Sequence, residues 1–306
     1  MERMDYILVK PSQIYLFEKT PLYSHEKEGA FILYKESGQS LDRDKAQGKK
    51  HPDLYIDAKD HDAALVELSS ALNMDLVNSI ASKGLTKVKN VLCRIVEEAL
   101  TPNQVAILPA LPDTIEILLE GYAKDHRSVE YLTRIAGNSS VMIEHTVNVM
   151  ALVLQYCFFH GFDEDRIKQL ALCGLLHDIG TSQIDKAILE TPRKLTDSEF
   201  KIYSGHTVIG HDLLICETDF DICVATVAFE HHERVDGSGY PNGITKIIFD
   251  SRLISIIDCY EHLTYRDKPF RRAKKPYETL SLIKEEVKGG KFDKEIFVNF
   301  TSCLTK

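Results

Sequence analysis

Histidine and aspartate residues in the C-terminal half of the chain have the types and surroundings of metal ligands. The chain has 12 histidines, and single ones such as His25, His51 and His126 need no function. The C-terminal set stands among apolar residues, as in LLHDIG and SIIDCYEHL. Buried polar groups must be paired, and neutral imidazole commonly binds transition metals. Each histidine alone would be read as an ordinary hydrogen-bonded residue, but together they indicate a shared site. The candidate ligands are His145, His177, Asp178, His206, His231, His232 and Asp258.

The His177-Asp178 pair is suited to a site with two metal ions. Adjacent helical residues point about 100° apart, so the two side chains can serve different metals or different sides of one. A carboxylate has two oxygens, so Asp178 can bridge two ions roughly 3.5–4 Å apart, the spacing used in two-metal phosphoryl transfer. Such a centre needs ligands from several helices, and the candidate set supplies them.

The first 60 residues are expected to form strands. Short runs of β-branched, aromatic and aliphatic residues, MDYILVKP, QIYLFEKT, GAFILYKE and DLYIDA, alternate with turn formers. From His61 to Leu100 the apolar residues recur at helical spacing. We therefore predict a small α+β domain over 1–112. Its role is unknown, and a sensor or docking module is only one interpretation.

The segment TPNQVAILPALPD (101–113) contains three prolines, which do not fit inside a regular helix, and is the expected domain boundary. Asp163 and Thr196 are expected to cap helices, and Glu199 completes a capping box with Thr196. The fold class is thus α+β overall, with an all-α bundle over 113–306. The predicted helices of this part are 113–125, 127–137, 141–160, 164–178, 196–216, 220–232, 250–265 and 276–288.

Composition limits the class of partner and location. The net charge of −9 argues against binding to a nucleic-acid polymer. The seven cysteines are scattered singly and are expected to be reduced, buried thiols. The N-terminus lacks the pattern of a signal peptide, and the apolar run ALVLQYCFFHGF (151–162) is too short to span a bilayer. We expect a core helix there, a cytoplasmic protein and no membrane partner.

The ordered series H…HD…H…HH…D resembles the metal signature of the HD superfamily of phosphohydrolases. HHERVDGSGYPNG (231–243) is similar to the hallmark HHE…DG.GYP.G of its HD-GYP branch. LLHDIG, ILETPRKLTDSEFKIYSGH, SRLISIIDCYEHLT and KPFRRA add to the resemblance, which covers roughly 130–306 with the motifs in family order.

The resemblance implies a helical HD domain that hydrolyses cyclic di-GMP to pGpG and onward to GMP, using iron or manganese and a hydroxide bridging two metals. It assigns one metal to His145, His177, Asp178 and Asp258. It assigns the other to Asp178, His206, His231 and His232, with Asp178 as the bridging, catalytic carboxylate. Relatives with a third metal have a glutamate where this chain has Val141, and Glu144 is expected to point elsewhere, so two ions are predicted.

The residues expected to contact the substrate phosphates depart more from the family pattern than the candidate metal ligands do. RDKPFRRAKKP (266–276) has six basic residues in eleven; by itself such a run is a solvated surface, but the resemblance favours phosphate contacts by Lys268 and Arg271. The family's HDIGK becomes HDIGT, so Thr181 stands where a lysine is expected at the phosphate. Glu261 and Phe270 replace the aspartate of D.YDALT and the tyrosine of RPYR.

These departures leave two functions open. The first is a cyclic dinucleotide phosphodiesterase, with full, weak or altered activity. The second is a catalytically impaired relative that binds the nucleotide or a partner protein as a signalling module. A phosphohydrolase for another phosphoester is a further alternative.

The glycine-rich part of HHERVDGSGYPNG has an ordinary explanation as a turn. Directly after a histidine pair, it is more naturally a lip of the active site, for contacts to substrate or to a signalling partner. Glu233 is expected to support the metal site without binding metal. The loop residues singled out are Glu233, Asp236, Gly237, Gly239, Tyr240 and Pro241.

Overall fold

The structure is a computed structural model, and it confirms the expected fold class of a small antiparallel sheet followed by helices. It describes residues 6–26, 30–41, 51–82, 84–101, 105–122, 132, 141–264 and 272–304. The chain divides into two compact units, residues 1–78 and 79–306. The domain boundary expected between 112 and 113 stays a prediction.

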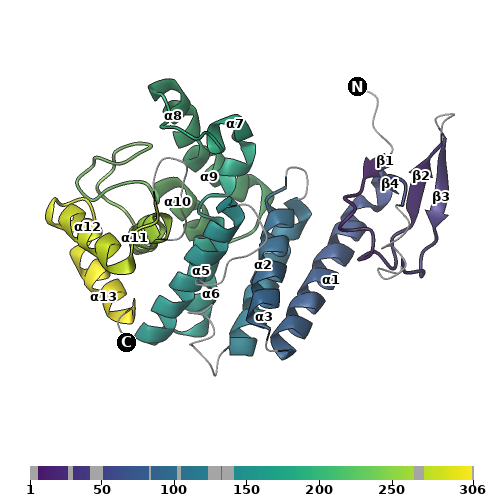
Figure 1. Ribbon diagram of the computed structural model, residues 1–306, viewed down its shortest axis with the longest axis horizontal. Helices are drawn as coiled ribbons and strands as arrows, with labels where there is room; N and C mark the ends of the chain where they lie inside the picture. The colour runs from purple at the N-terminus through teal and green to yellow at the C-terminus, as the bar shows by residue number, and fades with distance from the viewer. Residues whose placement is uncertain are drawn as a thin grey trace. The chain divides into compact units, whose positions relative to one another are not determined.

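The N-terminal unit contains a four-stranded antiparallel sheet, drawn in purple in Figure 1. Its strands lie in the order β1-β4-β2-β3, where β1 is Tyr6–Leu8, β2 is Leu22–His25, β3 is Phe31–Lys35 and β4 is Leu54–Asp57. Three of them fall within predicted strands. A 3₁₀ turn, η2 (Ala58–Asp60), leads into α1 (His61–Ala81), where the helical spacing begins.

The strand predicted at QIYLFEKT is wrong, because residues 11–16 form turns and β2 begins only at Leu22. Ile14 and Phe17 are both buried, which is the three-residue spacing of a turn and not the alternation of a strand. The carboxylate of Glu67 accepts hydrogen bonds from the main-chain N–H groups of residues 18, 19 and 20 at 2.6, 2.6 and 2.9 Å. Those groups are therefore not available to a sheet.

The second unit is helical. Its elements are α2 (Leu85–Ala99), η3 (Val105–Ala110), α3 (Leu111–Tyr122), α5 (Val141–His160), α6 (Glu164–Leu176), η4 (Ile179–Gln183), α7 (Lys186–Leu189), α8 (Asp197–Ser204), α9 (His206–Glu217), α10 (Ile222–Glu230), α11 (Phe249–Thr264), α12 (Pro276–Lys288) and α13 (Lys294–Leu304). The expected caps at Asp163 and Thr196 are confirmed, including the capping box with Glu199.

Two differences from the predicted helices stand out, and one predicted helix is not tested. The single helix expected over 196–216 is two helices, α8 and α9, separated at Gly205. The C-terminal helix α13 was not predicted. The helix expected over 127–137 lies outside the described residues, apart from Leu132.

Helix α5 forms the centre of this unit and packs against α2, α6, α11 and α13 (Figure 1). It is apolar on all sides, as a fully surrounded helix must be: Val147, Val149, Ala151 and Val153 are each fully buried. By length and composition alone Met142–His160 would cross a membrane, but 78% of that stretch is buried inside the protein. The predicted core helix is thus confirmed, with the predicted bounds 141–160.

Candidate metal centre

The seven candidate ligands come from five helices or their ends. His145 lies in the second turn of α5, and Asp258 lies in the middle of α11. His177 follows the last residue of α6, and Asp178 precedes η4. His206 begins α9, while His231 and His232 follow the end of α10. Because α6 packs against both α5 and α10, and α5 against α11, these positions converge inside the unit.

The structure brings the candidates together in two clusters that share Asp178. One consists of Asp178, His206, His231 and His232, and the other of His145, His177 and Asp178. Within each cluster the ligand atoms all lie within 4.8 Å of one another. Asp258 joins the second cluster through its Oδ1, which lies 3.2 Å from Nε2 of His145. The arrangement agrees with the two ligand sets that the resemblance implies.

Three of the rings have their protonation fixed by the main chain. Nδ1 of His177 donates to the carbonyl of Gly174 at 2.9 Å, and Nδ1 of His206 donates to Tyr203 at 2.6 Å. Nδ1 of His231 lies 3.0 Å from the carbonyl of Ala228, one turn earlier on its helix. In the neutral imidazole only one nitrogen carries hydrogen. The Nε2 lone pairs of all three therefore face the interior of the site.

Several of these inward-facing atoms have no hydrogen-bond partner. They are Nε2 of His177, Nε2 of His232 and Oδ1 of Asp178, all buried. Oδ1 of Asp178 lies 3.2 Å from Nε2 of His206 and 3.4 Å from Nε2 of His231, but without hydrogen-bond geometry. Unpaired buried acceptors are destabilising, whereas a cation between them satisfies all of them at once. The donor set of imidazole nitrogens and carboxylate oxygens fits iron, manganese or zinc.

The pKa values follow from burial and from these neighbours. Burial lowers the pKa of His177 to about 4 and holds that of His232 well below its usual range, so both rings are neutral at pH 7. Burial opposes ionisation of Asp178, but the facing histidines, His177 foremost, keep the pKa of its carboxyl group well below normal. Asp258 is likewise held ionised, chiefly by its hydrogen bond to His145. The two carboxylates are therefore charged and the two rings neutral, as metal binding requires.

His145 differs from the other rings because a carboxylate, and not the main chain, accepts from its Nδ1. Nδ1 donates to Oε2 of Glu261, which lies one turn after Asp258 on α11. Burial by itself would lower the pKa of His145, but the charge of Glu261 and the bond to Asp258 raise it well above its usual range. A carboxylate behind a metal-binding histidine fixes the ring and increases its basicity.

Glu261 was noted in the sequence only as a departure from the family pattern, and the residues behind it were missed. Its Oε1 accepts from Nδ2 of Asn148 at 2.7 Å, and Oδ1 of Asn148 accepts from Nζ of Lys89 at 2.7 Å. Glu261 and Asn148 each stand three residues after a candidate ligand, a spacing that places them on the ligand's helix face. Lys89 carries no such signal.

Glycine at position 180 allows the His177-Asp178 segment to approach α9. A Cβ atom there would lie 2.0 Å from the carbonyl oxygen of His206 and 2.5 Å from the main-chain nitrogen of Gly210. No side chain fits at such distances. Gly180 thus keeps Asp178 and His206 close enough to share one ligand sphere.

The loop after His232 is held from inside by Glu233. Its carboxylate is buried and accepts from the main-chain N–H groups of Asn242 at 2.8 Å and Ile244 at 3.1 Å. A Cβ atom at Gly239 would lie 2.4 Å from Cα of Glu233, so the loop folds back on its own start. The ring of Tyr240 lies 4.6 Å from that of His232. The loop therefore borders the histidine cluster, as expected of a lip.

The remaining loop residues shape the turn. Oδ1 of Asp236 accepts from the main-chain nitrogen of Ser238 at 2.9 Å, and Gly237 has a φ of +80°. Pro241 follows Tyr240 through a cis peptide bond. Neither Asp236 nor Pro241 lies in the two metal-binding clusters.

The predicted substrate contacts are placed only in part. Thr181 is buried, and its hydroxyl group donates to the carbonyl of Asp178 at 2.6 Å. Its contact with a phosphate stays a prediction. Lys268, Phe270 and Arg271 lie outside the described residues, so the phosphate contacts expected of Lys268 and Arg271 are not placed. The side chain of Val141 is also outside the described part, and Glu144 is buried and belongs to neither cluster.

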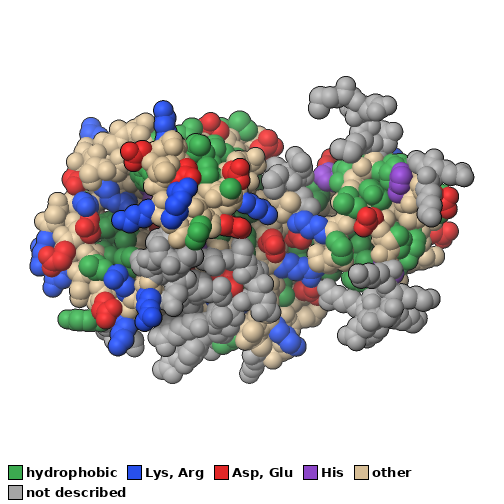
Figure 2. Space-filling view, turned by 45° about the horizontal axis from the view of Figure 1, so that its top comes forward, with side chains coloured by type: hydrophobic (Ala, Val, Ile, Leu, Met, Phe, Trp, Pro, Cys, Tyr) green, Lys and Arg blue, Asp and Glu red, His purple; other side chains and the backbone are tan. Residues whose placement is uncertain are grey.

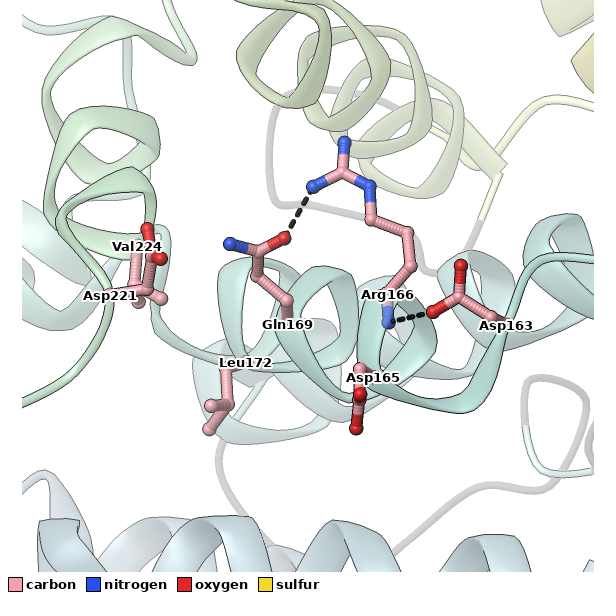
Figure 3. A pocket seen from close by; sticks show the side chains of 7 residues that line it. All are labelled: Asp163, Asp165, Arg166, Gln169, Leu172, Asp221 and Val224. Carbon is pink, nitrogen blue, oxygen red and sulfur yellow. Dashed lines mark hydrogen bonds between the residues drawn. The ribbon is translucent and has the colours of Figure 1, made fainter.

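A surface pocket of about 510 Å³ lies apart from this chemistry (Figure 3). It is lined by Asp163, Asp165, Arg166, Gln169, Leu172, Asp221 and Val224. Its one basic side chain, Arg166, donates to Gln169 at 2.5 Å and forms an ion pair with Asp250. None of the lining residues is a candidate ligand, so we assign the pocket no role. On the face drawn in Figure 2 the visible histidine atoms lie over the N-terminal unit, in keeping with the burial of the site histidines.

Comparisons with known proteins agree with this geometry. A family model described as HD domain matches residues 130–296. The chain is 30% identical over 175 residues to a cyclic di-GMP phosphodiesterase of Pseudomonas aeruginosa, covering 56% of this chain and 42% of that protein. It is 32% identical over 165 residues to a 3′3′-cGAMP-specific phosphodiesterase of Vibrio cholerae, covering 53% and 38%.

A response regulator of Xanthomonas campestris, also a cyclic di-GMP phosphodiesterase, is 30% identical over 170 residues, covering 55% of this chain and 43% of that protein. The matches thus span about two fifths of the length of these relatives. The solved structure of Bd1817, an HDG"Y"P protein from Bdellovibrio bacteriovorus, superposes with a TM-score of 0.64 at 17% identity, covering 99% of this chain and 100% of that one. The family model covers more than half of the chain, which therefore belongs to the HD domain family.

Proposed function

We propose that this chain is a metal-dependent phosphodiesterase that hydrolyses a cyclic dinucleotide, cyclic di-GMP first, to linear pGpG and onward to GMP. The observation that carries the proposal is the pair of clusters that share Asp178, with the Nε2 lone pairs of His177, His206 and His231 turned inward. The relatives that share this part of the chain act on cyclic di-GMP or on 3′3′-cGAMP.

Two transition-metal ions, iron or manganese, fit this site. When bound, they would supply a nucleophile at neutral pH by lowering the pKa of water, and they would neutralise charge on the phosphoryl oxygens. Asp178 would bind both ions, with His145, His177 and Asp258 completing one site and His206, His231 and His232 the other.

The protein's own residues orient these ligands. Main-chain carbonyls accept from Nδ1 of three imidazole rings, which leaves Nε2 of each neutral ring as the ligand atom, and Glu261 orients the ring of His145 by accepting from its Nδ1. Tyr240, whose ring lies 4.6 Å from that of His232, would line the entrance to this site. The loop of residues 233–241, which we call the GYP loop, is thus our candidate for contacts with substrate or with a signalling protein.

A second function is favoured by one observation. Thr181 brings no charge to the site, and its hydroxyl group donates a hydrogen bond to the main-chain carbonyl of Asp178. The positively charged side chain that the family pattern places here, for contact with a substrate phosphate, is therefore missing. A chain that binds metal and nucleotide but hydrolyses slowly would act as a signalling module.

One assay separates the two functions. The full chain is reconstituted anaerobically with Fe²⁺ or Mn²⁺, incubated with cyclic di-GMP or 3′3′-cGAMP, and the products are separated by chromatography. If the chain is a phosphodiesterase, wild type should form linear dinucleotide with time, and the variant D178N should form none. Measurable nucleotide binding with no product under either metal would contradict it and support the signalling module.

A further inference from the structure

A buried lysine lies behind the metal centre, at the end of a continuous chain of hydrogen bonds. Lys89, on α2, is fully buried. Its Nζ donates to the main-chain carbonyl of Leu132 at 2.8 Å and to Oδ1 of Asn148 at 2.7 Å. Nδ2 of Asn148 donates to Oε1 of Glu261 at 2.7 Å, and Oε2 of Glu261 accepts from Nδ1 of His145. The chain ends at a candidate metal ligand.

Lys89 fixes the orientation of the Asn148 amide, and through it the oxygen of Glu261 that the amide occupies. An ammonium group can only donate, so the oxygen of the Asn148 amide must face it. The amide nitrogen then faces Glu261, whose second oxygen is left for His145. With Nδ1 of His145 donating to Glu261, its Nε2 faces Asp258 and Asp178, 3.2 and 3.9 Å away.

The chain also balances charge inside the protein. Glu261 is 3% exposed, and a buried carboxylate without a compensating cation is strongly destabilising. His145 contacts this carboxylate directly, and Lys89 adds a second positive charge on the far side of Asn148. A second buried lysine, Lys35, shows a different use: its Nζ donates to three main-chain carbonyls, of Glu18, Glu36 and Gln39, within the N-terminal unit. The link from Lys89 to a histidine ligand is therefore not a general consequence of burying lysine.

We propose that Lys89 is a positioning residue for His145, acting through Asn148 and Glu261, and that it sets the affinity of the metal site to which His145 belongs. The inference rests on the proposed metal centre. Lys89 lies outside residues 130–296, which match the HD domain, and α2 packs directly on α5. The segment before the HD domain thus takes part in building its metal site.

The test is a Mn²⁺ titration of the full chain, stripped of metal beforehand, followed by calorimetry. Wild type is expected to bind in two steps. K89M should raise the dissociation constant of one step roughly 10-fold, the lower end of what loss of a ligand's supporting partner does. The other step, at His206, His231 and His232, should change less than about twofold, within the error of independent sites. N148A should weaken the same step.

Two controls isolate the effect from loss of stability. K35M removes a buried lysine far along the chain from the ligands and should leave both steps unchanged. In the step that K89M weakens, the double variant K89M/N148A should have a dissociation constant no larger than that of the more strongly affected single variant. The reason is that both residues act through one path. Circular dichroism verifies folding, and N148A, which breaks the same path at the next residue, replaces K89M if K89M does not fold.

Either of two results would overturn the role of Lys89: a folded K89M, or N148A in its place, with both dissociation constants of wild type, or additive effects in the double variant. A wild-type chain that binds fewer than two Mn²⁺ ions would instead contradict the metal centre itself. The two failures are therefore distinguishable.

Discussion

Nε2 of His206 and Nε2 of His231 face each other at 3.5 Å, although the residues are 25 positions apart in sequence. Both rings donate from Nδ1 to main-chain carbonyls, so in their neutral forms two lone pairs point at each other. Oδ1 of Asp178 lies against both nitrogens. A cation among these three atoms removes the repulsion. This relationship is the structural core of the metal-centre interpretation.

Replacing His206 by asparagine should remove one metal ion per chain and lower kcat at least 100-fold. Mutation of a residue that only supports a metal ligand lowers metal affinity or activity roughly 10–100-fold. Loss of a ligand itself should therefore have a larger effect. Metal content by mass spectrometry and turnover of cyclic di-GMP provide the measurement. H211N, on the same helix but half-exposed beside Asp212, is the matched control and should retain both ions. Equal metal content in the two variants would contradict the assignment of His206.

Acid should destabilise the metal-stripped protein partly through His177. The unfolded ring takes up a proton near its normal pKa of 6.5, whereas the folded ring does so only at a pKa of about 4. Between these values the unfolded state binds more protons, so the free energy of unfolding falls as pH falls. His145 and His206, whose pKa values are raised, act in the opposite direction. The contribution of His177 is therefore obtained by difference.

The measurement is urea unfolding of wild type and H177N, both free of metal, from pH 7 to 4. The wild-type free energy should decline more steeply, by up to about 1.4 kcal/mol per pH unit for one proton. Parallel curves across this range would show that His177 is not held neutral by burial.

Most of the ligand set was predictable from the sequence because ligand chemistry restricts residue type. Histidines and aspartates beside apolar residues, in family order, indicated the seven positions that the structure brings together. The support behind them was not predictable. Lys89 precedes Asn148 by 59 residues, and lysine in a helix is normally solvated. Only the packing of α2 on α5 reveals their contact.

The fold shows the same division. Residues 141–160 and 276–288 were predicted with the bounds that α5 and α12 have, because their apolar spacing and flanking residues are local signals. The strand predicted at QIYLFEKT was wrong because the structure there depends on a distant residue. The carboxylate of Glu67 accepts hydrogen bonds from the N–H groups that a strand would use. Gly205 splits a predicted helix just before His206, which then begins α9.

Alanine at Gly180 should damage both stability and metal binding. Its Cβ would lie 2.0 Å from the carbonyl oxygen of His206, so the His177-Asp178 segment and α9 must separate. Such overpacking should lower the free energy of unfolding by about 1–3 kcal/mol and reduce Mn²⁺ binding. G289A is the control, since its Cβ would meet atoms no closer than 3.4 Å. Metal affinity equal to wild type in G180A would mean that this approach does not define the site.

Glutamine at Glu233 should loosen the GYP loop without removing metal. Glutamine has one acceptor oxygen, so one of the N–H groups of Asn242 and Ile244 loses its hydrogen bond. The free energy of unfolding should fall by about 1–3 kcal/mol, since the lost acceptor is buried and charged. If the loop contacts substrate, KM should rise more than kcat falls, while metal content stays at wild type. E217Q, at an exposed glutamate, is the control. A loss of metal in E233Q would instead place Glu233 among the groups that hold the ions.

The most direct test of the metal centre is anomalous diffraction at the manganese edge, from crystals of the full chain grown with Mn²⁺. The account predicts two peaks roughly 3.5–4 Å apart, as in two-metal phosphoryl-transfer sites, both in contact with Asp178. One peak should lie among His206, His231 and His232, and the other among His145, His177 and Asp258. A single peak, or peaks away from Asp178, would contradict it.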